Sequence, residues 1–474
     1  MKRNLINGVW RDGADSQANI SPANIHDVIG HYARGSAADV AEAAAAARKA
    51  AVGWAEATPQ VRSDLLARTA RSLNDRLDAI GSVLAREEGK TLIEAKAEVA
   101  RAAQIFSYFS GEALRLTGDS IASVRPNVDI AVTREPLGVV GLITPWNFPI
   151  AIPAWKIAPA LAYGNTVILK PADLTPACAH ILAEILVEAG CPAGVFNLVM
   201  GRGSEIGSAL TDTADVDGIS FTGSSAIGRG IAVRCAERLV RVQLEMGGKN
   251  PTIVMDDADL DVTVPACINS AFYSTGQRCT ATSRFIVHAA IHDAFVERMC
   301  SEMQALVVGD PLDAATQMGP VVSERQLQAN LGYVGLAARE GCEVIGGESE
   351  PSNGWFQRPA MFLNANNDMR VTREEIFGPC AAVIRVADFD EAIAVANDTE
   401  FGLAAGICTT SLRHARAFQR QSSAGMVMTN LPTAGVDYHV PFGGRRASSY
   451  GTREQGQYAR EFYTEVKTSY CYAG

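Results

Sequence analysis

The sequence lacks an uninterrupted apolar run of membrane-spanning length, and it has no excess of basic residues. Its most apolar stretch, 138–169, contains four prolines and the polar side chains of Asn147 and Lys156. Such groups are costly in lipid and suit a buried strand, turn and helix, so we expect no membrane association. The 42 Lys and Arg residues are outnumbered by 52 Asp and Glu residues, which gives a formal net charge of -10. This balance argues against nucleic acid as a partner.

Cysteine pairs of the Cys-x-x-Cys type are also missing, although ten cysteines are scattered from Cys178 to Cys471. The first ten residues include Lys2 and Arg3 but no apolar segment of the kind that signal peptides carry. In a long chain these features predict reduced thiols and a cytoplasmic location. The seven histidines show no metal-ligand spacing, so no metal site is predicted.

The length and the order of apolar segments define the expected fold. At 474 residues the chain is longer than a single hydrophobic core usually supports, so two or three domains are expected. Short apolar strands alternate with helical stretches, and the strands are predicted at 139–143, 166–170, 195–199 and 218–221. This alternation predicts a doubly wound, Rossmann-type parallel sheet that carries its ligand at the carboxyl ends of the strands.

Other elements flank this sheet. An Asn-Gly turn in 5–10 predicts a small hairpin. Apolar residues at three- and four-residue spacing predict helices at 37–48, 59–88 and 91–116, followed by a β-like segment at 118–132. The alternation resumes at 250–444 and predicts a second α/β domain, in which the acidic turn 256–260 caps a helix. The tail, 460–468, alternates like an exposed edge strand that could pair with another subunit.

Two fragments carry side chains suited to acyl chemistry. Cys279 follows a small, flexible Ser-Thr-Gly approach, and Glu245 precedes the glycines Gly247 and Gly248. A thiol can attack a carbonyl carbon, a carboxylate can activate water, and glycines let the backbone approach a bulky cofactor. Taken alone, a lone cysteine is more often a small buried apolar residue.

Further polar groups follow the predicted strands. The glycine patterns 201–207 and 223–228 each open a helix, where bare backbone amides can bind phosphate, although a tight turn is the alternative. Lys170 and Asp173 could bind ribose hydroxyls or form a surface ion pair. Asn147, held between two prolines, could stabilise an oxyanion or satisfy backbone carbonyls as a turn amide.

Seven motifs stand in one order along the chain. They are Thr-Pro-Trp-Asn-Phe-Pro at 144–149, Lys-Pro at 170–171, Phe-Thr-Gly-Ser at 221–224, Glu-Met-Gly-Gly at 245–248, Gly-Gln-Arg-Cys at 276–279, Glu-Glu-Ile-Phe-Gly-Pro at 374–379 and Pro-Phe-Gly-Gly at 441–444. Through them the whole chain resembles the NAD(P)-dependent aldehyde dehydrogenase family.

The resemblance implies an α/β fold with a Rossmann-type cofactor domain, an α/β catalytic domain and a β oligomerisation arm that makes a homodimer or homotetramer. The implied boundaries are 1–117 and 137–248 for the cofactor-binding domain, 249–445 for the catalytic domain, and 118–136 and 446–474 for the oligomerisation segments.

The resemblance also implies residue roles. Cys279 forms a thiohemiacetal with the aldehyde, Asn147 and the Cys279 amide hold the oxyanion, and Glu245 activates the water that hydrolyses the thioester. Lys170 is placed with this catalytic set and binds a ribose of NAD or NADP. The residues implied to contact the cofactor are Ile143, Thr144, Pro145, Trp146, Lys170, Ala172, Asp173, Gly203, Gly207, Phe221, Thr222, Gly223, Ser224, Met246, Gly247, Glu375 and Phe377. Those expected to contact the substrate are Trp146, Arg278, Thr280, Asn430, His439 and Phe442.

Within the family, 430–444 and 448–456 resemble the α-ketoglutaric semialdehyde dehydrogenases, apart from the pair Arg445-Arg446. Arg278 precedes the nucleophile, and its planar guanidinium could bind a substrate carboxylate. It could instead depress the thiol pKa or pair with a structural acid such as Asp437. The favoured substrate is therefore a semialdehyde that carries a carboxylate, with a neutral aliphatic or aromatic aldehyde as the alternative.

Three other readings compete with a hydrolytic dehydrogenase. The first, a non-catalytic binding or structural protein built on the same fold, is disfavoured by the intact Cys279, Glu245 and Asn147. A cysteine hydrolase would use Cys279 with a histidine, but no histidine stands in a suitable signature and hydrolysis needs no dinucleotide sheet. A dehydrogenase that passes its acyl group to coenzyme A would not need the acid at Glu245. Asp173 is one methylene shorter than the glutamate common at its position in the family. We therefore expect both NAD and NADP to work, with NAD modestly preferred.

Overall fold

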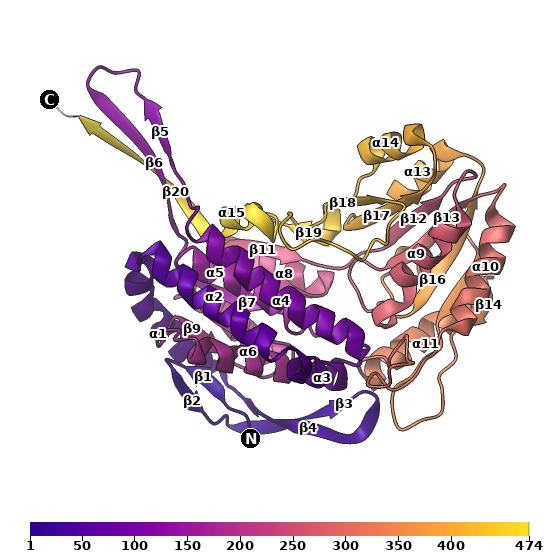
Figure 1. Cartoon of the computed structure of the whole chain (residues 1–474), viewed down its shortest axis with the longest axis horizontal. Coiled ribbons are helices and arrows are strands. Elements are labelled where there is room, and N and C mark those ends of the chain that lie inside the picture. The colour runs from indigo at the N-terminus through magenta and orange to yellow at the C-terminus, as the bar shows by residue number, and fades with distance from the viewer. Residues whose placement is uncertain (473) are drawn as a thin grey trace.

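The computed structural model describes residues 1–472 and 474, and it builds two mixed sheets that lie beside each other with a thin arm projecting from one of them (Figure 1). The chain starts with the predicted hairpin, β1 (Asn4–Ile6) and β2 (Val9–Arg11). Its turn residues Asn7 and Gly8 have φ values of 53° and 75°. Two positive φ values match the strand twist of a two-residue hairpin, so this prediction is confirmed.

The eight-stranded sheet has the order β19-β11-β10-β7-β8-β9-β1-β2. Its other strands are β7 (Val139–Ile143), β8 (Thr166–Lys170), β9 (Phe196–Leu198), β10 (Gly218–Thr222), β11 (Arg241–Glu245) and β19 (Ser449–Tyr450). The strands from β7 to β11 pair in parallel, and β7 and β8 are buried along their whole length because helices cover both faces. The predicted Rossmann-type sheet is confirmed.

The strand order reverses on either side of β7, which lies between β8 and β10. In such sheets the crevice at the reversal receives the ligand. The crossovers are α5 (Ala151–Ala162), α6 (Pro176–Glu188), the π-turn Gly203–Gly207 with α7 (Ser208–Asp212), and α8 (Ser225–Glu237).

Four long helices and a second hairpin cover this sheet. They are α1 (Ala37–Glu56), α2 (Pro59–Asp75), α3 (Leu77–Glu88) and α4 (Leu92–Glu112), with the strands β3 (Asp15–Ser21) and β4 (Asn24–Arg34). The predicted helix 59–88 is in fact two helices, because Arg76 adopts φ −109° and ψ 13° and interrupts the ladder. Helix α4 packs against α2 and α5 and begins with a capping box between Thr91 and Glu94.

The seven-stranded sheet has the order β14-β15-β16-β13-β12-β17-β18, parallel except for β14. Its strands are β12 (Asn250–Val254), β13 (Thr282–His288), β14 (Glu343–Gly346), β15 (Ala360–Ala365), β16 (Cys380–Val386), β17 (Ala404–Cys408) and β18 (Met426–Thr429). Its helices are α9 (Leu260–Phe272), α10 (His292–Ala305), α11 (Glu324–Arg339), α12 (Arg370–Arg373), α13 (Phe389–Asn397) and α14 (Leu412–Gln421). The acidic turn caps a helix as expected, since the Asp259 side chain accepts from the Asp261 amide at the start of α9.

The arm is a three-stranded antiparallel sheet of β5 (Asp119–Ala122), β6 (Val128–Pro136) and β20 (Thr464–Tyr472). The tail prediction was wrong at its start. Residues Arg460–Tyr463 form the short helix α15, because Phe462 and Tyr463 are buried in the core beside the eight-stranded sheet and only the residues beyond them extend outward (Figure 1). The range 446–474 thus includes β19 and α15 of the main body as well as an arm strand.

Candidate active site

Cys279 lies where two cavities meet. It lines one cavity of about 350 Å³ toward α4 and a second of about 350 Å³ toward the end of β10. The chain reaches it through the 3-10 turn Tyr273–Gly276, in which Ser274 and Thr275 have φ values of 52° and 56°. Residues other than glycine rarely adopt this left-handed backbone conformation, and such strained residues are frequent at functional sites. Gly276 is required there, since a Cβ would lie 2.3 Å from the Gly378 carbonyl oxygen.

The residue Cys279 as a whole is partly exposed, but its thiol is surrounded by groups that disfavour its ionisation. Burial raises the pKa of Cys279 to about 12, and the negative charges of Glu245 and Glu375 act in the same direction. The backbone N–H groups of Cys279 and Thr280 act in the opposite direction. The thiol therefore needs a base or a nearby positive charge to become a nucleophile.

Asn147 is held rigidly beside this thiol. Its side chain is buried, and Nδ2 donates to the Gln277 backbone carbonyl oxygen at 3.0 Å. The backbone carbonyl oxygen of Asn147 accepts from Lys90 Nζ at 2.7 Å. A carboxamide carries two N–H groups, so the satisfaction of one carbonyl still leaves a donor at the cavity that Asn147 and Cys279 both line.

Glu245 ends β11 and is turned toward the C-terminal segment. Its Oε2 accepts from Ser449 Oγ at 2.5 Å, and its buried Oε1 has no partner among the described residues. Burial raises the pKa of Glu245 well above its ordinary value, and Glu454 adds to the effect, whereas Ser449 and Lys156 oppose it. Glu245 is not among the residues that line either Cys279 cavity, so its carboxyl group must turn from Ser449 to reach a water near the thiol.

A further cavity of about 580 Å³ runs along the carboxyl ends of β7, β8 and β10, and it shares lining residues with the second Cys279 cavity. Every residue expected to contact the cofactor lines one of these two cavities. Along the larger lie Ile143, Thr144, Pro145, Trp146, Lys170, Ala172, Asp173, Gly203, Gly207, Phe221, Thr222, Gly223 and Ser224. Nearer Cys279 lie Met246, Gly247, Glu375 and Phe377.

Local geometry suits this groove to a dinucleotide. Ser224 precedes α8 without capping it, so the backbone amides at the helix start face the cavity. Glu375 accepts from the Gly248 amide at 2.9 Å, and a Cβ on Gly247 would lie 2.2 Å from Glu375 Oε2. Burial raises the pKa of Glu375 to about 7. Lys170 Nζ pairs with Asp173 Oδ1 at 2.9 Å, so the ion pair that we had considered does form.

The expected substrate residues divide between several places. Arg278, Thr280 and Phe442 line the cavity toward α4. Trp146 instead lines the cofactor groove, with its ring edge-on to Phe377 at 5.4 Å between centroids. In the cavity toward α4 the tryptophan is Trp155 of α5, whose ring centroid lies 5.3 Å from that of Phe442.

Asn430 and His439 are not among the residues that line this cavity. The Asn430 side chain exchanges two hydrogen bonds with the backbone of Thr409 and so fixes the loop after β18. His439 is exposed, 5.5 Å from the Tyr438 ring. His439 was expected near the substrate because its loop precedes Phe442, and Asn430 because it begins the motif 430–444, but both residues are exposed.

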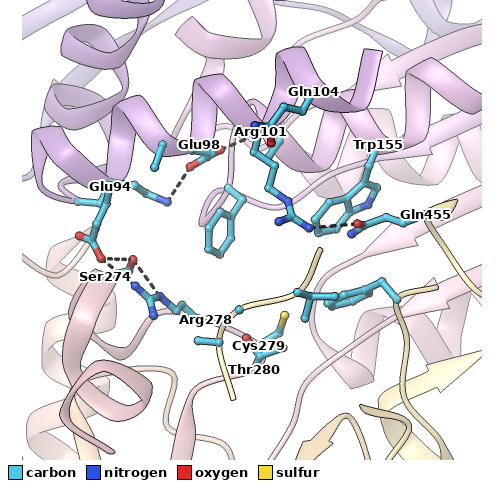
Figure 2. A pocket seen from close by; sticks show the side chains of 18 residues that line it. Glu94, Glu98, Arg101, Gln104, Trp155, Ser274, Arg278, Cys279, Thr280 and Gln455 are labelled. Atoms are coloured by element: carbon cyan, nitrogen blue, oxygen red, sulfur yellow. Dashed lines mark hydrogen bonds and ion pairs between the residues drawn. The ribbon is translucent and has the colours of Figure 1, made fainter. Parts of the chain in front are cut away.

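Arg278 points away from the thiol (Figure 2). Its Nη2 pairs with Glu94 Oε1 at 2.8 Å, and its other nitrogens donate to Ser274 and Asn269. Of the two alternatives, the structure thus favours pairing with a protein acid. The acid is Glu94 on α4, and not Asp437, because α4 passes directly over the strained turn before Cys279.

Sequence reasoning missed Arg101 and Gln455, which also line this cavity. Glu94, Glu98 and Arg101 stand four and three residues apart, the spacing that places side chains on one face of a helix. This signal was present, but nothing in the sequence indicated that the face borders the thiol.

The structure described here includes no helix long and apolar enough to cross a membrane, and no group of three potential metal ligands occurs within residues 1–472 and 474.

The fold and this site are typical of a dehydrogenase: a groove along the strand ends lies on one side of the Cys279 thiol and a separate cavity on the other. The chain belongs to the aldehyde dehydrogenase family, whose model matches residues 10–469. It is 44% identical over 473 residues to the alpha-ketoglutaric semialdehyde dehydrogenase of Bacillus subtilis (98% of this chain, 97% of that one). It is 42% identical to the alpha-ketoglutarate semialdehyde dehydrogenase of Haloferax volcanii (99% of this chain, 98% of that one). Among solved structures, betaine aldehyde dehydrogenase of Staphylococcus aureus in complex with NAD+ is similar, with a TM-score of 0.97 and 32% identity over 100% of this chain and 95% of that one.

Proposed function

We propose that the protein oxidises an aldehyde whose far end carries a carboxylate, namely α-ketoglutaric semialdehyde to α-ketoglutarate, with NAD or NADP as oxidant. The observation that carries the chemistry is the position of Cys279 at the junction of a dinucleotide groove and a substrate cavity. The names of the Bacillus subtilis and Haloferax volcanii relatives, which match over nearly the whole chain, support the substrate.

In this reaction Cys279 adds to the aldehyde carbon, and the resulting oxyanion accepts hydrogen bonds from the Asn147 amide and the Cys279 backbone N–H. When bound, NAD or NADP would supply the acceptor for the hydride that leaves the former aldehyde carbon, and Cys279 would then hold the acyl group as a thioester. Glu245 then takes a proton from water, the water oxygen bonds to the acyl carbon, and the C–S bond breaks to release the acid and restore the thiol. The α8 amides, Lys170 and Glu375 hold the cofactor.

Two features of the charged groups bear on pH. Burial raises the pKa of Cys279 to about 12, which leaves its thiol neutral near pH 7, and burial also raises the pKa of Glu245 above its ordinary value. Because the thiolate attacks and the carboxylate takes the proton, activity should rise with pH from neutral into the alkaline range.

We assign 1–117 and 137–248 to cofactor binding, 249–445 to catalysis, and the arm to assembly of a dimer or tetramer. Support for assembly comes from β20, whose residues from Glu465 to Tyr472 are all exposed, including Val466 and Tyr470 at about 60%. An exposed strand edge with apolar side chains is a surface for pairing with another copy. All ten cysteines are free thiols, which supports a reducing compartment such as the cytoplasm.

An aldehyde panel tests the proposal directly. Purified protein with NAD or NADP is given succinic and α-ketoglutaric semialdehydes and neutral aldehydes of equal length, and formation of the reduced cofactor is followed by absorbance. We expect kcat/KM to be highest for the acids and all turnover to disappear in Cys279→Ala while cofactor binding remains. A preference of the wild type for neutral aldehydes would contradict the proposed substrate, and turnover by the Ala variant would contradict the nucleophile.

A further inference from the structure

Three cationic side chains line the substrate cavity: Lys90, Arg101 and Arg278. Lys90 is buried and satisfied, since Nζ donates to Glu98 at 2.8 Å and to the Asn147 carbonyl at 2.7 Å and lies over the Phe148 ring. Arg278 Nη2 pairs with Glu94 Oε1 at 2.8 Å. Two of the three positive charges are therefore neutralised inside the protein.

Arg101 differs from the other two. Within the part of the chain that the structure describes, its guanidinium makes one hydrogen bond, from Nη2 to Gln455 Oε1 at 3.2 Å, and no ion pair within 4 Å. A guanidinium carries five N–H donors, so most of them remain available. Arg101 extends from α4 across the cavity toward Gln455 and Trp155, on the side opposite Cys279 (Figure 2).

Gln455 shows that this end of the cavity is a built polar site. Its side chain is fully buried, and its Nε2 has no hydrogen-bond partner among the described residues. Its backbone adopts φ 60° and ψ 170°, a region that is nearly restricted to glycine. A buried amide donor without a partner is destabilising, and an acceptor on a bound ligand would relieve this cost beside Arg101.

Arg101 keeps its positive charge at this position. Burial lowers the pKa of Arg101, while Asp437 and Glu98 oppose the shift, and an arginine stays protonated under all ordinary conditions. With the acids Glu94 and Glu98 each paired to a cation, the wall of the cavity carries one unneutralised positive charge.

We propose that Arg101, assisted by the Gln455 amide, binds the carboxylate of the substrate, and that Arg278 does not. This inference rests on the proposed oxidation of a carboxylate-bearing aldehyde and names the residue that selects it. The acid lies at the α4 end of the cavity, its carbon chain lies along Phe148 and Trp155, and its aldehyde carbon reaches Cys279. An anion there satisfies donors of Arg101 and the free N–H of Gln455 together.

The test compares Arg101→Met, which keeps the aliphatic stem, with Arg101→Lys, which keeps the charge but not the fork. Each is assayed with succinic semialdehyde and with butanal, and glutarate is titrated as a competitive inhibitor. The matched control is Arg115→Met, because Arg115 follows the same helix but is exposed and pairs with Glu112. Thermal unfolding of each variant checks that it is folded.

We expect Arg101→Met to raise KM for succinic semialdehyde and Ki for glutarate by about 30-fold or more, the loss typical of a buried charged partner. Its constants for butanal should change less than about threefold, Arg101→Lys should show an intermediate loss, and Arg115→Met should match the wild type. Equal losses on both aldehydes, or none on either, would overturn the role of Arg101.

The two ideas fail in different ways. If the wild type itself prefers butanal, the proposed substrate class is wrong. If the wild type prefers the acid and Arg101→Met keeps that preference, only the assignment of Arg101 is wrong. Should Arg101→Met not fold, an unchanged acid preference in Arg101→Lys, together with an unchanged Ki for glutarate, would overturn it equally.

Discussion

Replacement of Ser449 by alanine removes the one hydrogen-bond donor that the structure gives to the Glu245 carboxyl group. The Ser449 hydroxyl donates to Glu245 Oε2 at 2.5 Å and at the same time accepts from the Gly444 amide at 2.6 Å. A hydrogen bond to a charged group contributes about 1.5–3 kcal/mol. Because the serine favours the carboxylate over the carboxylic acid, its loss should raise the pKa of Glu245, by about one to two units at 1.36 kcal/mol per unit.

The consequence is a shift in the pH dependence of thioester hydrolysis. Glu245 must be ionised to take a proton from water, so the acidic limb of the hydrolysis rate should move to higher pH by about one unit or more. The assay is a single-turnover experiment in which the acyl-enzyme is formed rapidly and its decay is followed from pH 6 to 10. Ser352→Ala, on an exposed loop, provides the control. An acidic limb that stays in place in Ser449→Ala would refute the idea that Ser449 sets the ionisation of Glu245.

Three further outcomes are expected. Both cofactors should work, with NAD modestly preferred. Asp173→Ala frees Lys170 from its 2.9 Å ion pair and should lower the ratio of kcat/KM with NAD to kcat/KM with NADP by about tenfold. An unchanged ratio would show that the Asp173 carboxylate does not face the ribose. Lys249→Met should raise the melting temperature at pH 7, because the buried Nζ has no partner in the described chain and burial lowers the pKa of this amine to about 7. Between about pH 7 and the ordinary lysine pKa, Lys249 is protonated in the unfolded chain but largely neutral in the folded protein. The free energy of unfolding of the wild type should therefore increase as pH rises through this range, and Lys249→Met should not show this increase. Val466→Asp should shift the assembly toward smaller species in analytical ultracentrifugation, whereas Thr468→Asp, already polar, should have a weaker effect.

The alternation of short apolar runs with helical stretches was sufficient to predict the Rossmann-type sheet, because strands buried on both faces contain continuous apolar runs, as β7 and residues 167–169 of β8 do. The position of a groove along the strand ends was equally accessible to prediction, since the residues that line it follow strand ends at one edge of the sheet. In both cases the information is local in the sequence. The ends of elements were less predictable: Arg76 interrupts a continuous helical pattern, and Phe462 is withdrawn from the tail by core packing.

The substrate cavity could not be predicted in the same way. It is built from α4, α5, the turn before Cys279 and the segment around Gln455, which lie far apart in the sequence. The partner of Arg278 is Glu94, 184 residues away, and no local pattern links the two. Which of several cations remains free depends on three-dimensional pairing, and this is why Arg101 emerged only from the structure.

The central claim is that oxidation proceeds through an acyl group on Cys279 that Glu245 releases by activating water, and Glu245→Gln tests it most directly. The variant is mixed with cofactor and succinic semialdehyde, reduced cofactor is followed by stopped flow, and the protein is then examined by intact mass spectrometry. We expect a burst of about one equivalent of reduced cofactor per subunit, then a stall, with the mass of the acyl group added at Cys279. Unchanged steady-state turnover, or a burst without any covalent adduct on Cys279, would contradict the account.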